Sequence, residues 1–164
     1  MSGSDLILLE EEHVRLSELA ETLLTQANAS FVGLIDRNGQ PLGWCGELPD
    51  VDRTALASLA AGNVAATEGL AEMIGEPSFA AMYHEGESEH LHMSTLGRIA
   101  ILVVAFNERS SLGLVRLRVR QLAPDFEEVF DVMESRSRNP GGSGALGLPE
   151  ITDEDIDSLF GDSF

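Results

Sequence analysis

The amino-acid sequence predicts an α+β fold with the element order helix, strand, strand, helix, strand, strand, strand, helix. Two observations lead to this prediction: stretches with helical spacing of apolar residues flank groups of short apolar runs, and tight-turn residues separate the runs within each group. With 164 residues, 43% hydrophobic and 23% charged, the chain has the composition of a folded domain with room for a short appendage.

The first three elements are predicted from the N-terminal third of the chain. Leucines recur at helical spacing over Glu10–Ala27, with glutamates in the remaining positions, which indicates a helix. Phe31–Asp36 and Pro41–Cys45 are short apolar runs. The step Asn38-Gly39 between them readily supplies the positive φ angles of a tight turn, so the two runs are predicted to form a hairpin.

A long second helix is predicted over Asp52–Ile74. Asp52 is a suitable N-cap, and Gly75 followed by Pro77 is a typical helix stop. Its side chains are apolar or small on nearly every face, so we expect it to be covered on both sides. The residues expected in the core are Leu56, Leu59, Ala60, Val64, Leu70 and Ile74.

Three more strands and a third helix are predicted after this helix. Phe79–His84, Leu91–Leu96 and Arg98–Phe106 are the strand candidates, with Gly97 at the reversal between the last two. The third helix is predicted because apolar residues recur at helical spacing over Val115–Met133. Within this range a short stretch alternates as a strand would, but the longer helical pattern outweighs it. Pro124 lies inside this range, removes one hydrogen bond and is expected to kink the helix near Arg120.

The chain is predicted to have three parts. Residues 1–138 form the domain, residues 139–149 form a flexible linker rich in Gly, Pro and Ser, and residues 150–164 form an acidic amphipathic segment. In the last part, Thr152 can cap a short helix and Ile151 can form a hydrophobic staple with Ile156. Such a short helix is expected to fold when it docks on a partner.

Charge and cysteine content exclude several functions. The formal net charge is −18, with 28 acidic and 10 basic residues, which disfavours nucleic acid and membrane surfaces and favours a partner with a basic patch. A single cysteine, Cys45, allows no internal disulfide, and the first residues lack a secretory pattern, so we expect the cytoplasm. No apolar run is long enough for insertion into a membrane.

No motif for catalysis, cofactor binding or nucleotide binding is recognisable, so we expect neither an enzyme nor a cofactor. The chain contains no lysine, which excludes a G-x-x-x-x-G-K-[ST] phosphate loop. One possible group of metal ligands is outweighed by its interpretation as a solvated loop between strands, and no metal is expected. That group is His84, His90 and His92 with Glu85, Glu87 and Glu89.

Two surface features allow alternative interpretations. The small residues of the second helix are spaced three or four apart, and we favour an interface over packing on the chain's own sheet, because so bare a face is unsuited to water. The arginines around the start of the third helix are interpreted as ion pairs with the acidic first helix, although Arg109 is a conceivable arginine finger for a GTPase. The two sets are Ser58, Ala61, Ala65 and Gly69, and Arg109, Arg116, Arg118 and Arg120.

Three segments carry a resemblance to a known family: Ser58–Ala66, His84–Gly86 and Ser111–Arg118. Together with the element order, they resemble the Roadblock/dynein light chain family, and within it the bacterial MglB type. The C-terminal stretch Ile151–Phe160 is also similar to the end of MglB from gliding bacteria. Pro124 departs from the smoother third helix of that pattern.

The resemblance implies a five-stranded antiparallel sheet with the second helix on one face and the first and third helices on the other. It further implies a homodimer that pairs through the second helix and a sheet edge, and that binds a Ras-like GTPase of the MglA type. The paired second helices would form the GTPase platform. The residues to which this carries over are Ser58, Ala61, Gly62, Ala65 and Gly69.

The resemblance implies activation of GTP hydrolysis by reshaping the GTPase, without a donated arginine, in cell polarity or gliding motility and with concentration at a cell pole. The alternative is a scaffold of the same fold that binds a GTPase or another Roadblock protein without changing hydrolysis. The C-terminal segment is implied to dock separately on the GTPase and to influence nucleotide exchange. Its docking residues would be Ile151, Ile156, Leu159 and Phe160.

Overall fold

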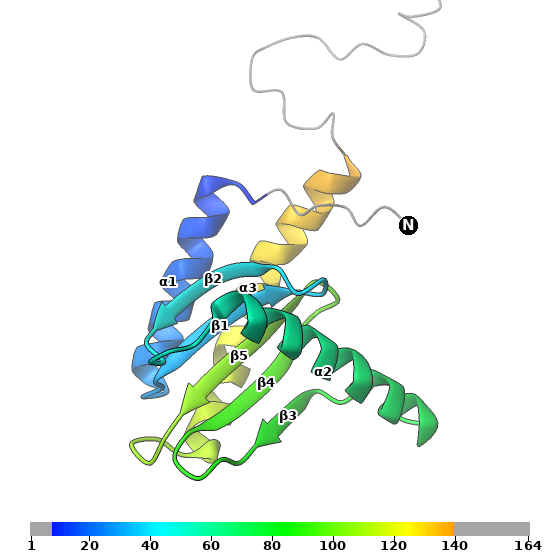
Figure 1. Ribbon diagram of the computed structural model, residues 1–164. Helices are drawn as coiled ribbons and strands as arrows, with labels where there is room; N and C mark the ends of the chain where they lie inside the picture. The colour runs from blue at the N-terminus through cyan, green and yellow to red at the C-terminus, as the bar shows by residue number, and fades with distance from the viewer. Residues whose placement is uncertain (1–7, 140–164) are drawn as a thin grey trace, which may run out of the picture.

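The structure is a computed structural model that describes residues 8–139, and its elements follow the predicted order (Figure 1). The N-terminal caps of the second and third helices are polar side chains. The Asp52 carboxylate accepts from the Ala55 amide at 3.1 Å, and the Ser111 hydroxyl accepts from the Leu114 amide at 3.2 Å. The elements are α1 Glu10–Gln26, β1 Phe31–Asp36, β2 Pro41–Gly46, α2 Arg53–Met73, β3 Ala81–His84, β4 His90–Leu96, β5 Ala100–Phe106 and α3 Leu112–Arg138.

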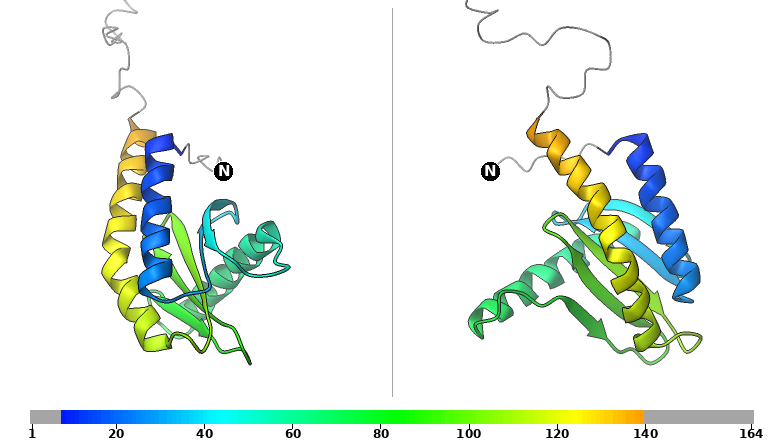
Figure 2. Two further views of the ribbon diagram at one scale, coloured as in Figure 1. Left: turned by 90° about the vertical axis from the view of Figure 1, so that its left-hand side faces the viewer. Right: turned by 180° about the vertical axis from the view of Figure 1, so that it is seen from behind.

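The strands form one antiparallel sheet in the order β2-β1-β5-β4-β3. Every residue of the central strand β5 is buried, as its run of Ile and Val predicts. Figure 2 shows α1 and α3 side by side on one face of the sheet and α2 on the other, which confirms the predicted three layers. The two edges of the sheet are β2, which α1 contacts, and β3.

Alternation of side chains along the strands divides the interior into two clusters. The larger cluster lies between the sheet and the pair α1 and α3, and includes Leu16, Phe106 and Phe126. The smaller cluster lies under α2, where Ala57, Ala60 and Val64 meet Ile35, Met93, Ile101 and Val103. Small alanines on α2 let this helix approach the sheet closely.

Several predicted boundaries differ from the structure at the turns. The strands predicted from Phe79 and Arg98 begin at Ala81 and Ala100, and β4 begins one residue earlier than predicted, at His90. The two predicted tight turns are confirmed by positive φ angles of 84° at Gly39 and 58° at Gly97. Phe79 and Ala80 precede β3 as part of the same apolar run, and Arg98 and Ile99 belong to the turn that contains Gly97, so the residue pattern placed both strand starts two residues too early.

The helices α1 and α3 are joined by an ion pair between Glu12 and Arg136. One guanidinium nitrogen of Arg136 donates to Glu12 Oε2 at 3.1 Å, and a second donates to Oε1. The same carboxylate accepts from the Leu9 amide at 2.9 Å, at the start of α1. The pair raises the pKa of Arg136 through its hydrogen bond to Glu12. The structure keeps Pro124 within one continuous α3.

Replacing Gly46 by Ala is expected to lower the free energy of unfolding by about 3 kcal/mol. Gly46 has φ of 80°, and an added Cβ would collide with the Ser30 carbonyl oxygen and lie 2.9 Å from Phe31 Cα. Urea unfolding measures the loss. The matched control is Gly43→Ala in the same strand, because a Cβ there meets no atom within 4 Å. Equal stabilities of the two variants would contradict the backbone geometry.

Candidate protein-binding surface

One side of α2 faces away from the sheet, and every residue on it is exposed. At 100° per residue, this side lies opposite the buried residues Ala57, Ala60, Val64 and Ala71. We call it the outer face of α2. It consists of Ala55, Ser58, Leu59, Gly62, Ala65, Ala66, Gly69, Leu70 and Met73.

The outer face carries large apolar side chains, of which the sequence assigned Leu59 and Leu70 to the core. Leu59 is 73% exposed, Leu70 59% and Met73 83%, and Ile74 at the end of the helix is 68% exposed. The prediction of a core position is therefore wrong for Leu59, Leu70 and Ile74, and it is confirmed for Ala60 and Val64, while Leu56 is half-buried. Because α2 is apolar on nearly all sides, its periodicity did not indicate which side meets the sheet.

Nothing among residues 8–139 requires glycine at the two glycine positions of the outer face. A Cβ added at Gly62 or Gly69 would meet nothing within 4 Å, outside the backbone of α2 itself. Neither glycine has the positive φ that would favour this residue. Glycine inside a helix lowers the stability of the fold by about 1 kcal/mol relative to alanine. No packing contact in the described fold offsets this loss. The lack of side chains at Gly62 and Gly69 would allow another molecule to approach the backbone of α2 closely.

The outer face contains no charged residue, although the chain carries a net charge of −18. The charged side chains of α2 lie on its flanks or at its start, at Arg53, Glu68 and Glu72. Glu68 forms an ion pair with Arg37, which also donates to the Gly97 carbonyl oxygen at 3.3 Å. This pair ties α2 to the β1–β2 and β4–β5 turns and leaves the outer face without charge.

The C-terminal half of α2 extends past the sheet, on the side where β3 forms the sheet edge (Figure 1). Among the strands that the structure describes, β3 pairs with β4 alone, so its other edge presents free backbone groups. Three of its four residues are exposed. An apolar helix and an open strand edge thus lie on one side of the molecule, an arrangement suited to pairing with another chain.

A family model for the Roadblock/LC7 domain matches residues 16–106, which run from α1 through the whole sheet. The chain belongs to the Roadblock/LC7 family.

Solved structures of MglB are similar to this Roadblock protein over most of its length. MglB of Myxococcus xanthus is 42% identical, with 77% of this chain and 96% of that chain covered and a TM-score of 0.73. A structure described as MglB with tetrameric arrangement is 32% identical over 80% and 99% of the two chains, at 0.74. The gliding protein MglB of Thermus thermophilus is 31% identical with the same coverage, at 0.72. A search of curated proteins finds no match.

The residues predicted to bind a GTPase lie along α2 of the Roadblock fold. Four of them are exposed on the outer face, and Ala61 is half-buried on the flank that faces the β1–β2 turn. The exposed four are Ser58, Gly62, Ala65 and Gly69. The predicted C-terminal docking residues lie outside the described residues, namely Ile151, Ile156, Leu159 and Phe160.

The histidines considered as metal ligands do not share one face of the sheet. Tyr83 lies opposite His92, and His84, the next residue along β3, therefore lies on the other face. His90 Nδ1 already accepts from the Gly86 amide at 3.1 Å. Within residues 8–139, no group of three or more His, Cys, Asp or Glu side chains is placed to hold a metal ion.

His92 is expected to make the stability of the Roadblock domain depend on pH. Burial, together with the charge of Arg116, lowers the pKa of His92 from 6.5 to about 4. Between these values the unfolded chain binds more protons than the folded one, so the free energy of unfolding falls as pH falls from 7 to 4. The His92 contribution to this loss is about 3 kcal/mol.

Urea unfolding between pH 4 and 7 tests the role of His92. His92→Leu is expected to show a smaller loss toward pH 4 than the parent protein. His84→Leu is the matched control, because His84 is exposed on β3 and should leave the pH dependence intact. The same slope in all three proteins would contradict this role of His92.

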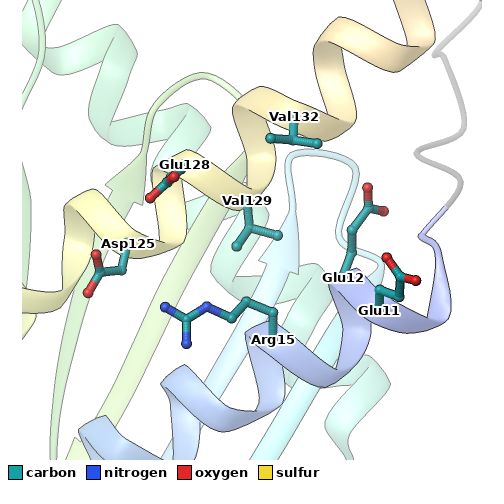
Figure 3. Close-up of a pocket in the computed structure, with 7 residues that line it drawn as sticks. All are labelled: Glu11, Glu12, Arg15, Asp125, Glu128, Val129 and Val132. Atoms are coloured by element: carbon teal, nitrogen blue, oxygen red, sulfur yellow. The ribbon is translucent and has the colours of Figure 1, made fainter. Parts of the chain in front are cut away.

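A shallow groove of about 280 Å³ lies between α1 and α3, on the layer opposite α2 (Figure 3). Figure 3 shows Arg15 extending from α1 into the space between the two helices. The groove has a mainly acidic lining, with one arginine and two valines. Its lining consists of Glu11, Glu12, Arg15, Asp125, Glu128, Val129 and Val132.

The arginines near the start of α3 do not form the ion pairs predicted with α1. Of the ion pairs in the described part of the chain, the one between α3 and α1 uses Arg136, and a second within α3 joins Arg138 to Glu134. The prediction is therefore wrong for Arg109, Arg116, Arg118 and Arg120, which have no carboxylate within 4 Å among residues 8–139. Glu12 of α1 pairs instead with Arg136, near the C-terminal end of α3.

The described residues contain no helix long and apolar enough to cross a membrane.

Proposed function

We propose that this Roadblock protein is a homodimer that accelerates GTP hydrolysis by a Ras-like GTPase of the MglA type, in cell polarity or motility. The observation that carries the proposal is the outer face of α2: it is exposed, uncharged and bare at Gly62 and Gly69. A close-packed partner is the simplest use of such a face. The similarity to MglB over most of the chain supports this choice of partner.

The two roles of α2 divide along its length in this proposal. The projecting end, with Leu70, Met73 and Ile74, would pair with the same helix of a second copy, and β3 would extend the sheet across the dimer. The small residues of α2 would face the GTPase, through Ala65 and Gly69 and also Ser58, Ala61 and Gly62. In the dimer, the small residues of the two α2 helices would form one platform.

Activation would depend on positioning within the GTPase. An activator accelerates hydrolysis only if it binds the hydrolysis-competent conformation more tightly than the resting one. A rigid helical platform supplies that preference by shape, and the GTPase's own residues then align with the γ-phosphate and the attacking water. The Roadblock protein would contribute no active site of its own.

Phosphate release under single-turnover conditions tests the proposal. The cognate MglA-type GTPase, loaded with GTP, is mixed with the purified Roadblock protein at saturating concentration. Faster release is expected, and it should persist in Arg109→Ala, because no arginine finger is involved. An unchanged rate despite binding in a pull-down would instead select a scaffold, and loss of stimulation in Arg109→Ala would overturn the mechanism.

The C-terminal residues Ile151, Ile156, Leu159 and Phe160 would dock separately on the GTPase and influence nucleotide exchange. Deleting residues 150–164 should weaken binding or change nucleotide exchange and leave the dimer intact. Loss of the fold on deletion would contradict this role.

A further inference from the structure

The first half of α3 has an exposed basic face. Arg116, Leu117 and Arg120 lie within about 100° on this helix and are all exposed, and Leu117 is 47% exposed. We call these three residues the basic face of α3. From residue 109 to residue 124 the sequence contains four arginines and no carboxylate. A short stretch of this strongly acidic chain therefore carries only positive charge.

No described carboxylate forms an ion pair with the basic face. The structure places no carboxylate within 4 Å of Arg116 or Arg120 in residues 8–139. The chain has 28 acidic against 10 basic residues, so the lack of neighbours is a local feature. The charge is also not explained by α3 itself, whose first turn contains no acidic residue to pair with it. An exposed leucine beside two arginines is suited to a partner that is both acidic and apolar.

The chain contains a segment of this chemistry beyond α3. Residues 150–164 include no basic residue, and their apolar residues are interspersed with acidic ones. We propose that, in the protein without its GTPase, this acidic segment docks on the basic face of α3 of the same chain. The acidic residues are Glu150, Asp153, Glu154, Asp155, Asp157 and Asp162, and the apolar ones are Ile151, Ile156, Leu159, Phe160 and Phe164.

The intervening chain is long enough for this contact. The 13 steps from Arg138 to Ile151 can span roughly 40 Å when extended. The distance back along α3 from Arg138 to Arg120 is about 27 Å at the rise of an α-helix. Residues 139–149 contain no charged side chain that would compete for the arginines. The acidic segment therefore reaches the basic face without any rearrangement of α3.

Tethering makes even a weak contact effective. A segment joined by a short linker acts at a concentration of about a millimolar, so contacts too weak to hold a free peptide become populated. Exposed pairs of arginine and carboxylate are screened by salt, so the docked fraction falls as ionic strength rises. Docking on α3 would hold the apolar residues of the segment away from other partners until a GTPase competes for them.

Paramagnetic broadening in NMR spectra of the full chain tests the contact. A nitroxide is attached at Ser163→Cys in a Cys45→Ser background, and the amide signals of residues 113–121 are followed. At about 0.01 M salt, where screening is weak, these signals should lose at least half of their intensity relative to the reduced label. At about 1 M salt the loss should disappear.

Charge-matched variants locate the contact. Arg116→Gln with Arg120→Gln should abolish the broadening at low salt, whereas Arg53→Gln with Arg98→Gln removes the same charge from exposed arginines elsewhere and should preserve it. Absence of broadening at low salt, or its survival in the α3 variant, would overturn the proposal. Broadening of equal strength in isotopically labelled chains mixed with spin-labelled, unlabelled chains would place the segment on a neighbouring protomer and overturn the intrachain contact. None of these results depends on GTP hydrolysis.

Discussion

Replacing Ala65 or Gly69 by Arg is expected to abolish binding of the MglA-type GTPase and to leave the Roadblock domain folded and dimeric. Both residues are exposed on α2, and a Cβ at Gly69 meets nothing within 4 Å, so the domain itself has room for a long side chain. Arg also favours a helix more than Gly does. Burial of a charge without a partner at the platform costs several kcal/mol, which corresponds to a loss of affinity of at least 100-fold.

Titration of the GTP-loaded GTPase measures this loss, and circular dichroism with light scattering checks the fold and the dimer. Gly113→Arg is a matched control, because Gly113 is also a helical glycine with open space around its Cβ, but it lies on α3 in the opposite layer. The control should bind as the parent protein does. Unchanged affinity in the two α2 variants would refute the assigned platform.

Replacing both Leu70 and Met73 by Asp is expected to convert the dimer into a monomer. The two side chains are 59% and 83% exposed in the isolated chain and are apolar, and they lie on the projecting end of α2. A dimer that buries them would have to bury two unpaired charges after the substitution, at a cost of several kcal/mol each. The dissociation constant should therefore rise by at least 100-fold.

Sedimentation velocity distinguishes a monomer of 17.6 kDa from a dimer of twice that mass. Val132→Asp is the matched control, since Val132 is an exposed apolar residue of α3 on the other layer. It should sediment as the parent protein does. A parent protein that is already monomeric, or a double variant that stays dimeric, would show that the projecting end of α2 is not the contact between protomers.

The sequence predicted the fold well because its local signals agree with the tertiary structure. Turn residues at Asn38-Gly39 and Gly97, the cap at Asp52 and the buried run Ala100–Phe106 each have one reasonable interpretation. The periodicity of α3 likewise marks its buried side, and the structure accommodates Pro124 within that helix. These features depend on short stretches of chain, which sequence patterns describe directly.

The candidate site could be predicted only in part. The row of small residues on α2 was visible in the sequence, and the structure leaves Ser58, Ala65 and Gly69 exposed and Ala61 half-buried. The interface itself stays a prediction. The exposure of Leu59 and Leu70 was not visible, because a helix that is apolar on all sides can pack either side against a sheet. In the structure the side that packs on the sheet is made mostly of alanines. Which arginines of α3 lie close to the acidic residues of α1 depends on how the two helices pack against each other. The spacing of residues in the sequence does not indicate this, so the predicted pairs of Arg116 and Arg120 with α1 were wrong.

Hydrogen exchange of the full chain, alone and with the GTP-bound MglA-type GTPase, tests the central claim most directly. Amides can be followed along α2 and, as an internal comparison, along α1, which lies on the opposite layer. The account predicts that the GTPase slows exchange over residues 58–70 and leaves residues 10–26 unchanged. Protection confined to α1 and α3, with no change along α2, would contradict it.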